Sequence, residues 1–165
     1  MIVIMVVGIA AVLIASLSTS ALNNARQERT AAALAQAKAA LIGYAATYGD
    51  THPGEVHGYL PCPDFAAGNP EGSAEAVCGT QDVNQIGRLP WRTLDLSLFR
   101  DGYGECLWYA VPGNYKNNPK TGLMNWDTNG RLQVFASDGT TRLDSDADQV
   151  VAVIFAPNAT LPGQD

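Results

Sequence analysis

The 165-residue sequence has only two histidines and no glycine-rich phosphate-binding motif, which limits the chemistry it can perform. Both histidines, His52 and His57, fall within one loop rich in proline and glycine. This spacing does not assemble a nucleophile, a base and an orienting acid. We therefore interpret both histidines as loop residues, and we expect a protein without enzymatic activity and without a cofactor.

Positive charge is also scarce. The chain carries 10 lysines and arginines against 16 aspartates and glutamates, which gives a net charge of -6, and the basic residues are scattered along it. A nucleic-acid-binding surface needs a basic stripe that neutralises phosphates. The composition therefore argues against a nucleic acid as partner.

Cysteine is limited to three residues, Cys62, Cys78 and Cys106, with no CxxC pair and no histidine at ligand spacing. This pattern argues against zinc and for one structural disulfide, which would place the domain outside the cytoplasm. We favour Cys62–Cys78, because closing a loop of about 17 residues would stabilise the fold by roughly 3 kcal/mol. Pairings of either residue with Cys106 are the alternatives. Cys106 itself lies in strand-like sequence and is interpreted as a buried free thiol, with an intersubunit bridge as its alternative.

One acidic cluster has the residue types of a cation site. Asp144, Asp146 and Asp148 alternate in the sequence, and alternate carboxylates can converge on a hard cation. An EF-hand loop would need glycine near its sixth position and an acid at its twelfth, where this chain has Gln149 and Phe155. We interpret the cluster as a solvated acidic turn and keep a calcium site as a weak alternative.

Charge is absent from the first 25 residues. A membrane-spanning helix needs about 20 mostly apolar residues, and Met1 to Leu22 supplies that length. The first proline is Pro53, so one helix is expected from Met1 to about Gly49. We divide it into an apolar half, residues 1–25, for the membrane or a filament core, and an amphipathic half, residues 26–49.

The amphipathic half carries one apolar stripe at spacings of three and four residues, which needs a packing partner. The remainder, residues 50–165, is expected to be a globular domain that supplies it. Residues rich in β-branched and aromatic side chains predict an antiparallel sheet against the stripe, whereas the proline-rich and glycine-rich stretch before it is expected to be irregular. The predicted fold class is α+β, with one long N-terminal helix, a small β-sheet and a disulfide-tethered loop. The stripe comprises Leu34, Ala37, Leu41, Tyr44 and Tyr48, and the predicted strands are Cys106 to Val111, Leu132 to Ala136 and Val150 to Ala156.

These features together resemble a mature type IV pilin or type II secretion pseudopilin. The start is hydrophobic with no basic leader, the helix continues amphipathically, and the domain after it is small and contains cysteines. The resemblance is carried further by four segments: "GYLPCPD", "GRLPWRTL", "DGYGECLWYAV" and "NNPKTGLMNW".

The resemblance implies a function and a route of assembly. A prepilin peptidase would remove a short leader, and Met1 would be the processed and methylated end. The subunit would sit in the inner membrane, and the pilus assembly machinery would then pack it with further copies of itself, or with other pilins, into a helical extracellular filament on the bacterial cell surface. The family usually has a glutamate at the fifth mature position, whereas this chain has Met5, which favours a minor or tip subunit or a filament without that ion pair.

Close helix packing in such a filament depends on small residues, because transfer from lipid to a helical bundle gains little hydrophobic energy. Gly8, Ala11 and Ala15 are the candidate packing residues. The alternative function is a membrane-anchored periplasmic binding domain that does not polymerise. In that case the surface loop from Pro112 to Gly130, with Tyr115 and Trp126, would bind a ligand or partner.

Overall fold

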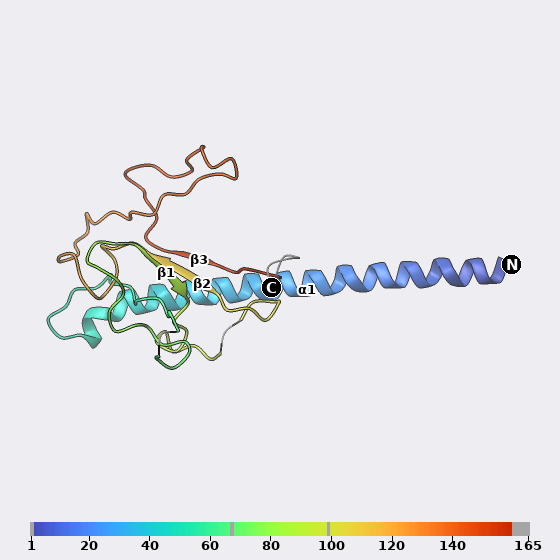
Figure 1. Cartoon of the computed structure of the whole chain (residues 1–165), viewed down its shortest axis with the longest axis horizontal. Coiled ribbons are helices and arrows are strands. Elements are labelled where there is room, and N and C mark those ends of the chain that lie inside the picture. The colour runs from blue at the N-terminus through green and yellow to red at the C-terminus, as the bar shows by residue number, and fades with distance from the viewer. Residues whose placement is uncertain (1, 67, 99, 160–165) are drawn as a thin grey trace.

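The chain folds into one long helix with a small domain packed around its second half (Figure 1). This computed structural model describes residues 2–66, 68–98 and 100–159, and within the helix it describes side chains from residue 19 onward. The domain gathers at the C-terminal half of the helix, while the N-terminal half extends away from it. The elements in chain order are helix α1 (Ile2–Thr51) and strands β1 (Gln85–Arg88), β2 (Trp108–Val111) and β3 (Val153–Phe155).

The end of α1 is fixed by local hydrogen bonds. The sequence predicts an end near Gly49, and the helix continues to Thr51. The Thr51 hydroxyl and the His52 amide both donate to the carbonyl of Tyr48, at 3.1 and 3.0 Å, so this carbonyl is satisfied although the helix stops. Pro53 then prevents continuation.

The sheet is antiparallel, as predicted, with the order β1-β2-β3. Strands β2 and β3 fall inside the predicted segments 106–111 and 150–156, although both are shorter. Strand β1 was not predicted, because its sequence, QIGR, lies in the stretch expected to be irregular. Gly87 permits this strand: a side-chain carbon there would lie 2.8 Å from the Pro63 side chain.

The predicted strand from Leu132 to Ala136 is wrong. This segment contributes only isolated bridges, Leu132 with Val150 and Phe135 with Arg142, and it does not join the sheet. Alternating apolar residues fit an exposed ribbon as well as a half-buried strand, so the pattern alone could not separate the two.

The core lies where the second half of α1 meets the sheet. Three predicted stripe residues of α1, Ala37, Leu41 and Tyr48, are buried, and Leu34 and Tyr44 are partly buried. Burial of one leucine side chain such as Leu41 stabilises the fold by about 1.5–3 kcal/mol, so this contact holds the domain on the helix. The rest of the domain contributes to this core the buried residues Leu60, Leu89, Leu94, Leu107, Tyr109 and Val111.

Two tethers order the irregular segment after α1. The disulfide Cys62–Cys78 forms as predicted. Beside it, the fully buried Lys116 ammonium donates to the backbone carbonyls of Cys78, Thr80 and Val83, the first at 2.9 Å and the third at 3.1 Å. The disulfide loop is therefore held from a distant part of the chain as well as by its own covalent bond.

Candidate assembly interface

The first half of α1 is the candidate assembly element. At about 1.5 Å per residue, the 50-residue helix is roughly 75 Å long, and Figure 1 shows no other described element beside its N-terminal half. Met1 lies outside the described residues, and at Gly8, Ala11 and Ala15 the structure describes the helix backbone alone. Among the helical residues with described side chains, no run is long and apolar enough to cross a membrane.

The domain contacts α1 near the middle of the helix, through Gly102 and Tyr103. The Thr30 hydroxyl donates to the carbonyl of Arg26 at 2.9 Å and accepts the amide of Gly102 at 2.9 Å. The Arg26 guanidinium lies 5.2 Å from the centre of the Tyr103 ring, a cation–π contact. A side-chain carbon at Gly102 would lie 2.0 Å from the Arg26 carbonyl oxygen, so only glycine allows this approach. These contacts therefore fix the point at which the helix leaves the domain.

An apolar groove runs between α1 and β3, and we call it the α1–β3 groove. Its volume is about 710 Å³, and among the described residues that line it Lys38 is the one with a charge. Lys38 makes no ion pair among the described residues. Ile42 lies in the groove with 59% of its surface exposed. The other apolar lining includes Leu34, Leu41, Val151 and Ile154.

A ribbon of two arms joined by isolated bridges, residues 131–150, stands away from the rest of the domain just before β3 (Figure 1). Its arms are joined by hydrogen bonds from Leu143 to Val134 and from Ala136 to Thr141, and its tip contains Gly139 at a φ of 68°. A left-handed φ favours glycine, so the tip sequence DGT suits a tight turn. The ribbon holds together through its own contacts.

The predicted acidic cluster lies on this ribbon and is partly neutralised there. The Arg142 guanidinium donates to Asp144 at 3.0 Å and also pairs with Asp146, while Asp148 accepts the Ser145 hydroxyl at 3.0 Å. The hydrogen bond from Arg142 lowers the pKa of the Asp144 carboxyl below its usual value. Within the described residues no group of acidic, histidine or cysteine side chains is arranged to hold a metal ion.

The loop from Pro112 to Gly130 divides into a buried and an exposed part. Tyr115 is half-buried and lines the α1–β3 groove, whereas Trp126 is 94% exposed. Lys116, next to Tyr115 in this loop, is fully buried, and no feature of the sequence predicts this burial. Burial lowers the pKa of its ammonium, and the nearby Asp82 carboxylate opposes that shift.

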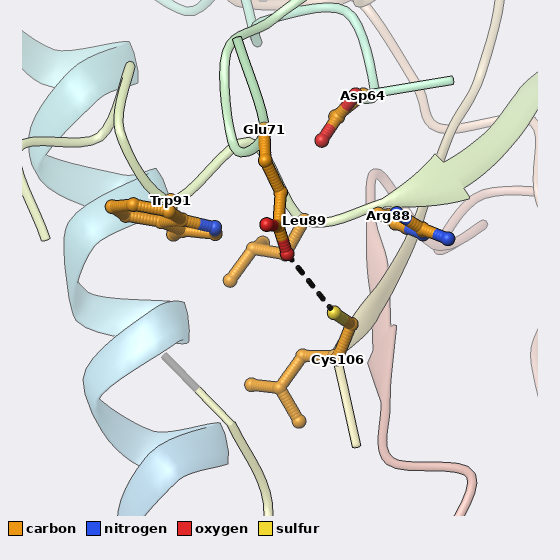
Figure 2. Close-up of a pocket in the computed structure, with 7 residues that line it drawn as sticks. Asp64, Glu71, Arg88, Leu89, Trp91 and Cys106 are labelled. Carbon is orange, nitrogen blue, oxygen red and sulfur yellow. Dashed lines mark hydrogen bonds between the residues drawn. The ribbon is translucent and has the colours of Figure 1, made fainter. Parts of the chain in front are cut away.

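Cys106 is free, as predicted, but it is half-buried rather than buried. Its thiol donates to a carboxylate oxygen of Glu71 at 3.9 Å and accepts the Arg100 guanidinium at 3.3 Å. Figure 2 shows Glu71 reaching down to this thiol inside a small pocket that Trp91 also lines. The thiol is thus hydrogen-bonded to Glu71 and Arg100 of its own subunit.

The two histidines lie apart from that pocket. His52 stacks on the Tyr48 ring with centroids 4.0 Å apart, and His57 lies 3.9 Å from the Asp50 carboxylate. Neither histidine lines the pocket that contains the Cys106 thiol, because both belong to the turn and loop after α1. The described contacts of both histidines are those of a helix end and its following loop.

Comparison of the chain with family models, with curated proteins and with solved structures gives no match.

Proposed function

We propose that this chain is a structural subunit of a type IV pilus-like or type II secretion-like extracellular filament, which polymerises through its N-terminal helix. The observation that carries the proposal is the division of α1. The second half buries Ala37, Leu41 and Tyr48 against its own domain, and the first half extends without a partner from the described chain (Figure 1). An uncharged helix half of this length needs an apolar environment, either lipid or further copies of itself.

The sequence of the first half of α1 is suited to close packing of helices. Close approach of helices needs small side chains, and Gly8, Ala11 and Ala15 provide them. A repeated head-to-tail contact with a rise along one axis produces an open fibre. The net charge of -6 keeps the outward-facing domains soluble. In this account the subunit waits in the inner membrane and is processed at Met1 before assembly.

The deciding experiment replaces Gly8 by leucine in the full chain. The helix keeps its hydrophobicity but loses close approach, so we expect electron microscopy to show few or no fibres while circular dichroism shows a folded domain. Val7→Leu is the matched control, because it also adds bulk to the apolar helix but leaves Gly8 in place, and it should form fibres. Normal fibres from the Gly8 variant would reject helix packing through that face. Mass measurement of the native N-terminus should further detect a methylated Met1.

A second candidate function has one observation in its favour. Trp126 is 94% exposed beside a pocket of about 480 Å³ lined by Ala45, Tyr115 and Met124, and an exposed tryptophan is a common anchor of binding surfaces. This feature would serve a membrane-anchored binding domain that does not polymerise. Detergent-dispersed monomers of the wild-type protein, with no fibres under any assembly condition, would favour it over the filament.

A further inference from the structure

We propose that the ribbon of one copy, residues 131–150, docks into the α1–β3 groove of the next copy. The inference rests on the proposed filament and deepens it, because it names the contact between neighbouring domains in addition to the helices. Two apolar surfaces are left uncovered by the described residues of one copy. Leu143 on the ribbon is 65% exposed, and Ile42 in the groove is 59% exposed.

The ribbon does not cover the groove of its own subunit. It leaves the domain immediately before β3, whose Ile154 lines the groove, and it extends away from α1 (Figure 1). Hydrogen bonds and ion pairs of the described residues 133–148 remain within the ribbon itself. At the base of the ribbon, Arg131 pairs with Asp82, which does not line the groove. As far as the structure describes the chain, the groove is therefore open to a segment from another molecule.

Charge favours a second copy as the occupant. The ribbon carries four aspartates against two arginines, a net charge of -2. The groove carries one charged side chain, Lys38, which has no ion-pair partner among the described residues. An acidic segment with exposed apolar side chains is thus complementary to an apolar groove with one lysine.

The geometry also fits a growing chain of subunits. The ribbon and the groove are different surfaces of the same molecule, so each copy can donate one ribbon and accept another. Such a heterologous contact leaves a free ribbon at one end and a free groove at the other. It can repeat along the axis set by the packed helices.

Two single substitutions test the contact through complementation. Leu143→Glu disables the ribbon and keeps the groove, whereas Ile42→Glu disables the groove and keeps the ribbon. Each full-length variant is studied in detergent micelles, which cover the apolar half of α1, by sedimentation velocity. We expect the dissociation constant for self-association of each variant to rise tenfold or more, since each places a carboxylate in an apolar contact.

The equimolar mixture gives the decisive result. It retains one intact ribbon and one intact groove, so we expect a one-to-one heterodimer that grows no further. The controls are Leu123→Glu and Val77→Glu, which place the same charge at leucine and valine residues that are 78% and 58% exposed outside both surfaces. Both should associate like the wild type. Circular dichroism and the intact disulfide confirm that each variant is folded.

Other outcomes overturn the proposal. Wild-type association by either single variant, or failure of the mixture to form a heterodimer, would reject docking of the ribbon in the groove. If Ile42→Glu fails to fold, the exposed Lys38→Glu replaces it and should weaken association at low salt; an unchanged affinity would again reject the contact. Fibres from the wild type together with a failed mixture would reject only this contact. A heterodimer without wild-type fibres would retain the contact and reject the filament.

Discussion

Replacing Lys116 by methionine should destabilise the domain strongly. Methionine has a similar length and fills the same buried space, but it cannot donate hydrogen bonds. The carbonyls of Cys78, Thr80 and Val83 would then lose the ammonium that they share. An unpaired buried polar group costs about 1–3 kcal/mol, and relief of the buried charge offsets part of the total. We expect a loss of about 3 kcal/mol in the free energy of unfolding.

Thermal unfolding followed by circular dichroism measures this loss. For a domain of this size, about 3 kcal/mol corresponds to a fall of roughly 10 °C in Tm. Lys38→Met is the control, because Lys38 is exposed and its replacement should change the stability by no more than about 0.5 kcal/mol. If the Lys116 variant melted within about 2 °C of the wild type, the hydrogen bonds from Lys116 to the three carbonyls would not stabilise the domain, and the reasoning would fail.

Three further predictions concern the same domain. Cys62→Ser should lower the free energy of unfolding by about 3 kcal/mol under oxidising conditions, measured by urea titration, because it opens the disulfide loop. Burial raises the pKa of the Tyr109 hydroxyl well above 10. Below pH 10 this hydroxyl is protonated in both states and its full contribution to the free energy of unfolding is present. Above pH 10 the contribution declines, because the unfolded chain loses the proton first. Tyr109→Phe should flatten that decline in urea titrations between pH 8 and pH 11. Gly102→Ala should lower Tm by several degrees, because the added methyl group meets the carbonyl of Arg26. Gly43→Ala should not lower it, because no atom of the described neighbouring residues lies within 4 Å of the added methyl group.

Each of these has an outcome that contradicts it. Equal urea midpoints for Cys62→Ser and the oxidised wild type would deny the disulfide its stabilising role. An alkaline decline unchanged in the phenylalanine variant would assign that decline to other groups, among them Tyr44, whose pKa is also raised by burial. Equal melting of the two glycine variants would show that the loop at Gly102 can move away from α1 without cost.

The parts of this fold that the sequence predicted depend on local or covalent signals. The helix follows from a run of good helix formers without proline, and its buried stripe follows from spacings of three and four residues. The pairing of Cys62 with Cys78 follows from their short separation along the chain. Strand β2 follows from its alternating aromatic and aliphatic residues.

The remaining parts depend on contacts between distant residues, and the sequence could not supply them. Strand β1 exists because Gly87 allows the Pro63 segment to approach and because β2 pairs with it. The cage of Lys116 is built from carbonyls more than 30 residues earlier in the chain, and carbonyls carry no sequence signature. The α1–β3 groove likewise arises only when Ile154 is placed beside the helix.

The buried Lys116 and the three carbonyls around it have a consequence for the conditions in which the domain stays folded. Many extracellular loops are fastened by a dissolved ion that dilution or a chelator can take away. Here the donor to the carbonyls of Cys78, Thr80 and Val83 is a side chain of the polypeptide itself, so neither dilution nor a chelator can remove it. The segment around the disulfide should therefore keep its shape whatever the mineral content of the surroundings.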